Sequence, residues 1–157
     1  MITFKELQGK LIEYVEVYVI LQRAINDEIL AMMQYLSGLG NCKDELIKKE
    51  FNEHALEEYE HAKKLFEILK ELGGNYKLYN PSMMFMNSDC GFRPAIGDKK
   101  CIINDNIKGE QCAIGSYNKL LVSYDFSDKH KQIIKEIIKD EEKHLKDLKE
   151  LLEKIKD

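Results

Sequence analysis

The chain has 157 residues, of which 44% are hydrophobic and 33% charged, with nine glycines, two prolines and no tryptophan. It is long enough to bury a core of its own, and its composition is that of a helical globular protein rather than a disordered or fibrous one. The formal net charge of −4, with both signs mixed along the chain, argues against a broad basic surface for nucleic acid.

The N-terminus and the apolar runs carry no sign of export or membrane insertion. Residues 1–4 are neither a basic tail nor a signal peptide, and no apolar stretch is long enough to span a bilayer. We therefore expect a single domain, residues 1–157, that is soluble and cytoplasmic, with no membrane contact and no direct binding of nucleic acid.

Helical periodicity predicts two long helices in the first half of the chain. The first runs from about residue 10 to 39 and ends at Gly40. The segment Thr3–Glu6 has the pattern of a capping box, which predicts a separate short helix before it. The second long helix covers about residues 44–72 and stops at Gly73.

Two further long helices are predicted in the second half. The third begins after an N-cap at Asp98 and ends near Tyr124, and the fourth begins after a cap at Ser127 or Asp128 and ends near Ile155. Short connections make each half of the chain an antiparallel hairpin.

The connection between the hairpins is much longer, from Gly73 to Gly97. A helix of about 25 residues is roughly 38 Å long. A loop of that many residues can span this length at up to about 3.3 Å per residue. The third helix can therefore start parallel to the second. This predicts an all-α, ferritin-like four-helix bundle with a long crossover between helices two and three.

Each predicted helix has an apolar stripe that is interrupted by a glutamate. On the second and fourth helices a histidine follows that glutamate three residues later, a spacing at which both side chains reach one point. The six interrupting residues are Glu28, Glu58, His61, Glu110, Glu141 and His144.

Taken one at a time, each of these carboxylates is most simply explained as part of a solvated helix face, because the chain has 28 acidic residues. An unpaired carboxylate among Leu and Ile, however, has a large desolvation penalty that a metal ion can offset. The two halves also repeat, since Glu28 precedes Glu58 by 30 residues and Glu110 precedes Glu141 by 31. A tyrosine follows the first glutamate of each pair by seven residues, namely Tyr35 and Tyr117.

This is the ligand pattern of di-iron carboxylate bundles. We expect Glu58 and Glu141 to bridge two metal ions, with Glu28 and His61 completing one site and Glu110 and His144 the other. Carboxylate and imidazole ligands suit Fe(II) or Mn(II), so we expect two iron ions per subunit, with manganese as the alternative. Tyr35 and Tyr117 are expected to donate hydrogen bonds to the bridging ligands, to supply electrons, or simply to fill the core.

The cysteines do not form a recognised metal motif. None of the four has Cys-x-x-Cys spacing, which excludes a rubredoxin-type iron site or a zinc ribbon. Cys42 and Cys101 are expected to be small buried hydrophobic residues. His54 is expected to be a core histidine with satisfied hydrogen bonds; the alternative is a group that supports the ligands or lies on an entry path to them. His130 is expected to lie at the surface.

The segment Glu110–Tyr117 resembles helix three of the Dps-like ferritins, also called thioferritins, within the ferritin-like superfamily. In that group one cysteine lies in the crossover loop and one directly follows the helix-three ligand, positions that Cys90 and Cys112 occupy here. The resemblance implies a redox cysteine pair beside the metal centre. It also implies a hollow homo-dodecamer that oxidises Fe(II), preferably with hydrogen peroxide rather than O₂, and stores the ferric product as protection against oxidative stress.

Departures from other relatives narrow this interpretation. Rubrerythrins have a second helix-three carboxylate where this chain has Ala113, and bacterioferritins bind haem through a Met where this chain has Tyr59, so no haem is expected. Large ferritins have a fifth helix after the fourth, whereas this sequence ends at Asp157, which favours twelve subunits over twenty-four.

Three functions remain open at this point. The first is a ferroxidase that stores iron. The second is a non-storing di-metal peroxidase or manganese catalase, similar to a rubrerythrin without its rubredoxin domain. The third is a helical interaction protein without metal, whose Glu and His side chains face solvent. Independently of the function, Cys90 and Cys112 are equally well explained as small buried hydrophobic residues.

Overall fold

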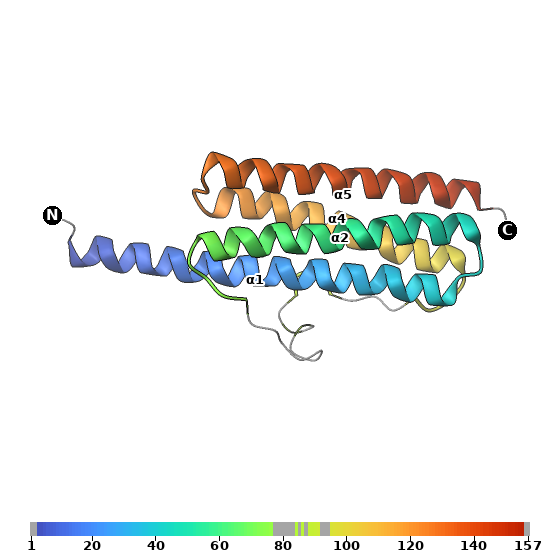
Figure 1. Cartoon of the computed structure of the whole chain (residues 1–157), viewed down its shortest axis with the longest axis horizontal. Helices are drawn as coiled ribbons and strands as arrows, with labels where there is room; N and C mark the ends of the chain where they lie inside the picture. The colour runs from blue at the N-terminus through green and yellow to red at the C-terminus, as the bar shows by residue number, and fades with distance from the viewer. Residues whose placement is uncertain (1–2, 77–83, 85, 87, 92–94, 156–157) are drawn as a thin grey trace.

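The computed structural model describes residues 3–76, 84, 86, 88–91 and 95–155. It contains four long helices, which lie side by side in a bundle (Figure 1). They are α1 (Phe4–Asn41), α2 (Glu45–Glu71), α4 (Lys99–Ser123) and α5 (Asp128–Lys154). The predicted all-α, ferritin-like bundle is confirmed.

The order of the helices requires a long crossover. Figure 1 shows that α4 begins at the end of the bundle opposite to the end of α2, so that these two helices run in the same direction. Most of residues 77–94 lie outside the described residues, and the crossover follows from the positions of the two helix ends. Within each half, α1 packs against α2 and α4 against α5.

The start of α1 differs from the prediction. The capping box is present, since the Glu6 amide donates to Thr3 Oγ1 over 3.2 Å and the Thr3 amide donates to Glu6 Oε2 over 2.7 Å. It caps the long helix itself, so the prediction of a separate short helix was wrong. The only helix-weakening residue early in α1 is Gly9, and one glycine costs about 1 kcal/mol, which a helix of 38 residues tolerates.

The other three helices begin as their sequences predict. Asp44 accepts hydrogen bonds from the amides of the first turn of α2, and Asp98 and Ser127 do the same for α4 and α5. His130, in the first turn of α5, was expected at the surface but is buried, with Nε2 2.9 Å from a Glu71 carboxylate oxygen at the end of α2. That contact closes the end of the bundle where α2 and α5 meet.

The apolar core is divided into two parts. One part fills the end of the bundle around Leu21, Leu65 and Ile134, and the other fills the opposite end around Phe51 and Ile103. On every helix the predicted ligand positions fall between the residues of these two parts. The fold therefore places six ionisable side chains in the middle of an otherwise apolar bundle.

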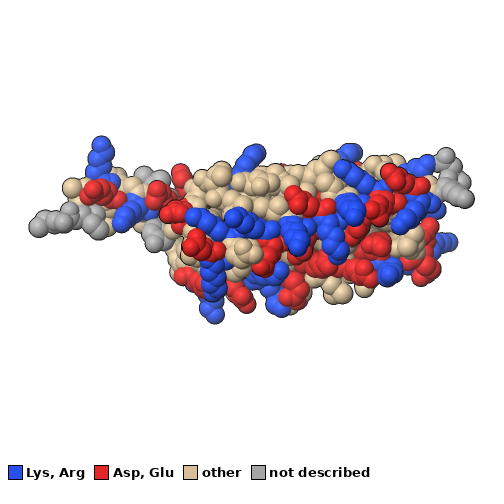
Figure 2. Space-filling model, turned by 90° about the horizontal axis from the view of Figure 1, so that it is seen from above, with Lys and Arg blue, Asp and Glu red and all other residues tan. Residues whose placement is uncertain are grey.

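The surface carries charges of both signs. Figure 2 shows lysine and arginine side chains interspersed with aspartate and glutamate along the face in view, without a large area of one sign. Within the described part of the chain, no helix is both long and apolar enough to cross a membrane.

Candidate metal centre

Each helix brings at least one ionisable side chain to the middle of the bundle. Glu58 and His61 lie one turn apart on α2, and Glu141 and His144 lie one turn apart on α5; all four are at most 1% exposed. Glu28 on α1 and Glu110 on α4 are buried as well. The structure thus brings together all six residues that the sequence singles out as metal ligands.

These side chains form two overlapping groups whose ligand atoms lie within 4.8 Å of one another. Glu58 and Glu141 belong to both groups, Glu28 and His61 to the first, and Glu110 and His144 to the second. The Nδ1 atom of His61 is 3.2 Å from Glu58 and 3.3 Å from Glu141. The Nδ1 atom of His144 is 3.1 Å from Glu141 and 3.3 Å from Glu58. Two carboxylates shared between two sets are suited to bridging a pair of cations.

Several carboxylate oxygens in this centre lack a hydrogen bond. The buried atoms are Glu28 Oε2, Glu58 Oε1 and Glu141 Oε1, and none has a hydrogen-bond partner among the described residues. Buried polar atoms without partners are rare in native proteins and are costly. Cations bound between the carboxylates would satisfy these oxygens, so the residues fit a di-metal centre.

Without metal, the charges in the centre are balanced by protons. Burial raises the pKa of Glu28 and of Glu110 well above the usual range, and the negative charges of Glu141 and Glu58 raise both further. Burial opposes ionisation of Glu58 as well, but the close contacts with the His144 and His61 rings hold its pKa at about 2. Contacts with the same two histidines lower the pKa of Glu141, against burial and the charge of Glu58.

The pKa values of the two histidines are shifted in the opposite direction, upwards, by the same contacts. Burial lowers the pKa of His144, but its close contacts with the carboxylates of Glu141 and Glu58 outweigh this effect and raise it to about 12. The pKa of His61 is raised for the same reason, with Glu28 contributing as well. The metal-free centre therefore holds protons that divalent cations would displace, and metal affinity should increase with pH.

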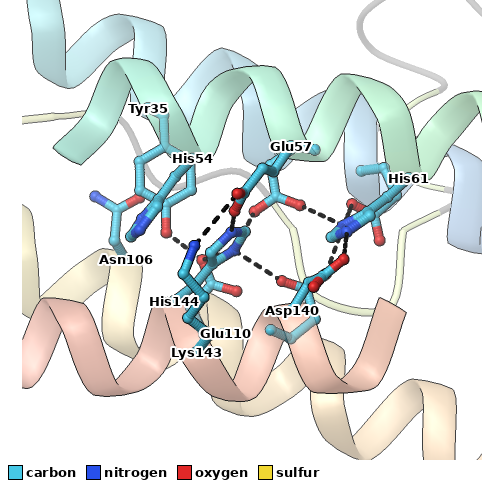
Figure 3. A network of polar contacts seen from close by, with 12 residues as sticks. Tyr35, His54, Glu57, His61, Asn106, Glu110, Asp140, Lys143 and His144 are labelled. Atoms are coloured by element: carbon cyan, nitrogen blue, oxygen red, sulfur yellow. Dashed lines mark hydrogen bonds and ion pairs between the residues drawn. The ribbon is translucent and has the colours of Figure 1, made fainter. Parts of the chain in front are cut away.

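The outer nitrogen of each histidine is held by a carboxylate from the opposite hairpin. His61 Nε2 lies 3.1 Å from Asp140 Oδ2 on α5, and His144 Nε2 contacts Glu57 on α2 (Figure 3). Carboxylates in this position orient a ligating imidazole and increase its basicity. Neither Asp140 nor Glu57 was predicted from the sequence to have a role at the site. The signal was present, because an acid immediately precedes both Glu58 and Glu141.

The two predicted tyrosines are paired across the hairpins. Tyr35 Oη on α1 donates a hydrogen bond to Glu110 on α4 (Figure 3), and Tyr117 Oη on α4 donates to Glu28 on α1. Burial, followed by the nearby carboxylate charges, raises the pKa of both phenols, so they remain donors. Each tyrosine thus contacts the glutamate of the other half, not the one seven residues before it. The prediction that they donate to the bridging ligands was wrong, because their partners are the glutamates that belong to one ligand group only.

Residues 19–157 match the family model that describes the ferritin-like domain. The chain belongs to the ferritin-like family. A comparison with curated proteins found no match. The relationship therefore rests on the family model and on solved structures.

Among solved structures, this ferritin-like protein is similar to a dodecameric thioferritin from Bacteroides fragilis, with 29% identity and a TM-score of 0.82 over 88% of this chain and 85% of that one. The fold is also shared with Dps from Thermosynechococcus elongatus, at 17% identity and a TM-score of 0.77 over 92% and 94% of the two chains. An archaeal Dps homologue from Halobacterium salinarum gives 13% identity and a TM-score of 0.81 over 92% and 83%.

A cavity of about 50 Å³ lies beside the centre of this ferritin-like protein. Its lining includes one of the candidate ligand carboxylates from each helix, together with Asp89 and Cys90 of the crossover loop. One water occupies about 10–15 Å³ by this kind of measure, so the cavity has room for a few water-sized molecules. A small oxidant could therefore reach the carboxylates from the side of the crossover loop.

The two cysteines at the positions that thioferritins also use are bonded to each other. Cys90 and Cys112 form a disulfide, with their Cα atoms 5.7 Å apart. Asp27 holds the loop that carries Cys90, because its carboxylate accepts hydrogen bonds from the Ser88 hydroxyl and from the amides of Asp89 and Cys90. Asp27 directly precedes Glu28, so the disulfide is tied to the metal centre. No sequence signal pointed to Asp27, because its partners are more than 60 residues away.

The other two cysteines are free thiols. Cys42 is buried in the core, as expected, whereas Cys101 is exposed, so the prediction that it is buried was wrong. Cys101 lies in the first turn of α4 next to the N-cap, where the helix faces solvent.

His54 also differs from its prediction. It lies on the inward face of α2 and is 1% exposed, but neither ring nitrogen has a hydrogen-bond partner among the described residues. Its ring stacks on that of His144, with centroids 4.1 Å apart. Burial and the neighbouring His144 lower the pKa of His54 to about 3. It is a core histidine, but not one whose hydrogen bonds are satisfied.

Proposed function

We propose that this protein is a di-iron ferroxidase of the mini-ferritin type. It oxidises Fe(II), with hydrogen peroxide as the preferred oxidant, and stores the ferric product as protection against oxidative stress. The observation that carries the proposal is the pair of overlapping ligand groups that share Glu58 and Glu141. Residues 1–157 would form one ferritin-like domain, because α1 continues without a break to Phe4, ahead of the matched region.

The ligands would hold the substrate iron as follows. Glu28 and His61 would bind one ion, Glu110 and His144 the other, and the two shared glutamates would contact both. Two Fe(II) ions in these positions supply the two electrons that reduce one hydrogen peroxide, with two protons, to two waters. Glu28 and Glu110 are protonated in the metal-free centre and would release protons as iron binds.

Residues around the ligands would keep them in position during this cycle. Tyr35 and Tyr117 remain protonated and restrain one oxygen of each terminal glutamate. Asp140 and Glu57 fix the ring orientations of the two histidines. The cavity beside the carboxylates is large enough for hydrogen peroxide. The preference for peroxide over O₂ is the expectation that follows from the resemblance of residues 110–117 and of the two cysteine positions to the thioferritins.

We further propose that the protein assembles as a homo-dodecamer. The Bacteroides fragilis relative is dodecameric. In this chain, the first part of α1 extends beyond the other helices (Figure 1) and exposes an apolar stripe. Its residues are spaced three or four apart and are 48–80% exposed: Phe4, Leu7, Leu11, Val15 and Val19. Contact with a second subunit would remove this stripe from water.

Stopped-flow oxidation of anaerobically added Fe(II), with limiting hydrogen peroxide compared with O₂, tests the proposal. Glu58→Gln should abolish the fast phase, because it removes a ligand that both ions share. Glu53→Gln makes the same change on the exposed face of α2 and should leave the rate unchanged. Absence of saturable Fe(II) binding near two ions per chain would refute the proposal in favour of a metal-free interaction protein.

Particle mass and retained iron, measured on the same sample, test the storage function. A dodecamer that retains many iron atoms per subunit supports storage. A smaller particle that consumes peroxide without retaining iron, or that works only with manganese, supports the peroxidase or manganese catalase instead.

A further inference from the structure

A third cluster of ligating side chains lies outside the di-metal centre, between α2 and α5. Glu50 and His54 are one turn apart on α2, and Asp147 faces them from α5. The Nε2 atom of His54 is 3.9 Å from Glu50 Oε2 and 3.8 Å from Asp147 Oδ2. One ligand atom from each residue lies within 4.8 Å of the others. None of the three residues belongs to the ligand set described above.

The His54 ring is the strongest sign that the cluster binds something. It is 1% exposed, and neither of its nitrogens has a hydrogen-bond partner in the part of the chain that the structure describes. A buried polar group normally has at least one partner, and leaving it without one is costly. The Nε2 nitrogen lies close to both carboxylates yet is too far from either for a hydrogen bond. An atom placed between the three would satisfy it.

The two carboxylates are accessible but are not neutralised by a basic side chain. The side chains of Glu50 and Asp147 are 24% and 28% exposed, so a hydrated ion can reach them. Among the described residues, neither forms an ion pair with a lysine or arginine, although Lys143 lies nearby and pairs with Glu57. Burial and the charge of Asp147 raise the pKa of Glu50. Lys49 and Lys143 act on Glu50, and Lys143 on Asp147, only from beyond ion-pair distance. The two acids are thus held close together without a lysine or arginine in direct contact among the described residues.

The distances suit a metal ion of the first transition series. Nitrogen and oxygen ligands lie about 2.0–2.2 Å from such an ion, so two donors to one ion are at most about 4.2–4.4 Å apart. Both His54 distances fall within this limit. An imidazole with two carboxylates suits Fe(II), Mn(II), Co(II) or Zn(II), whereas Ca²⁺ and Mg²⁺ prefer oxygen ligands alone.

We propose that Glu50, His54 and Asp147 form a third site for a divalent transition-metal ion, separate from the di-metal centre. The site stands on its own geometry and does not depend on ferroxidase activity. It lies next to the centre, because the His54 ring stacks on the ring of the ligand His144 (Figure 3). An ion bound there would be partly open to solvent through the two carboxylates.

Co(II) added anaerobically to the metal-free protein provides the test, with bound cobalt counted after dialysis. The wild-type chain should retain three ions. The double variant Glu50→Gln/Asp147→Asn should retain two, because it removes the third site but none of the six central ligands. The matched control Glu53→Gln/Glu150→Gln removes two exposed acids from the same two helices and should retain three. Three ions in both double variants would place the third ion elsewhere and overturn the inference.

Anomalous diffraction from cobalt-soaked crystals of the wild-type chain locates the ions directly and does not depend on whether a variant folds. A peak within coordination distance of His54 Nε2 is expected, and its absence when the di-metal centre is filled overturns the inference. Failure of the proposed function looks different. In that case the single peak would lie at His54 and the di-metal centre would remain without cobalt.

Discussion

Replacing Glu28 with glutamine should make the metal-free protein more stable at neutral pH and reduce the stabilisation that metal provides. Burial and the charges of Glu141 and Glu58 raise the pKa of the Glu28 carboxyl well above its usual value of 4.5. The folded, metal-free chain must therefore keep this side chain protonated under conditions in which the unfolded chain releases the proton. Glutamine imitates the neutral form and still offers an oxygen to the Tyr117 hydroxyl.

The sign and size of the effect follow from proton linkage. Below pH 4.5 both states are protonated, and the Glu28 carboxyl does not affect stability. Above pH 4.5, and until the pH reaches the folded-state pKa, the native state binds one more proton than the unfolded state. In that window the free energy of unfolding falls by about 1.4 kcal/mol per pH unit for this group. Glutamine removes that contribution, so the variant should gain on the wild-type protein as the pH rises within this window, by at most about 1.4 kcal/mol per pH unit.

Urea unfolding followed by circular dichroism measures this effect, at pH 6, 7 and 8 with a chelator and at one fixed protein concentration, because assembly also contributes to stability. Glu53→Gln is the control. It removes an exposed carboxylate 3.9 Å from Lys49, and such a surface pair contributes at most about 1 kcal/mol, without a comparable pH slope.

Adding Mn(II) should narrow the difference in stability between the two proteins. Ligand at 100 times its dissociation constant stabilises a protein by about 2.7 kcal/mol, and the variant should gain less because an amide is a weaker ligand than a carboxylate. If Glu28→Gln shows the wild-type pH slope without metal, or is the less stable protein at pH 8, the assignment of a buried, protonated Glu28 is wrong.

Three further predictions concern packing, the disulfide and the outer carboxylates. Gly38→Ala should destabilise the fold by about 1–3 kcal/mol, because the added Cβ would clash with the buried Phe51 ring. Gly115→Ala should stabilise the fold by about 0.5–1 kcal/mol, because the added Cβ would have no neighbouring atom within 4 Å. Thermal or urea unfolding measures both effects. Cys112→Ser removes a disulfide that closes a loop with a sequence separation of 22, and it should reduce the free energy of unfolding by about 3 kcal/mol under oxidising conditions. Under reducing conditions the variant should be as stable as wild type. An equal difference in stability under both conditions would argue against the disulfide. Asp140→Asn should weaken metal binding about 10–100-fold in calorimetric titrations, and unchanged affinity would exclude a role in orienting the imidazole.

The two halves of the chain depend on each other at the metal centre. Tyr117 of the second hairpin holds a glutamate of the first, Tyr35 of the first holds a glutamate of the second, and the outer carboxylates are exchanged in the same way. A hairpin alone would have its ligands but not the groups that orient them. We therefore expect correct docking of the hairpins to be required for metal affinity.

Most of the fold could be predicted because its signals are local. The N-caps at Asp98 and Ser127 and the spacing of Glu58 and His61 each depend on residues within one or two turns of a helix. The end of α2 at Gly73 is also a local signal, since this residue takes a positive φ of 86° that favours glycine. The prediction of a separate short helix before residue 10 failed because a single glycine is too weak a signal to end a helix.

The sequence by itself determined which six residues meet at the centre, since a helix of 3.6 residues per turn fixes which side chains share its inward face. It could not determine what each of these side chains contacts on another helix. Groups that are distant in sequence are joined by the hydrogen bonds of the two tyrosines, by the disulfide between Cys90 and Cys112, and by the hydrogen bonds from the crossover loop to Asp27. The lack of a hydrogen-bond partner for the His54 ring among the described residues also depends on residues that are distant in sequence. Only the packing of the two hairpins sets those distances, because contact across helices depends on their relative rotation and register, to which no local pattern is sensitive.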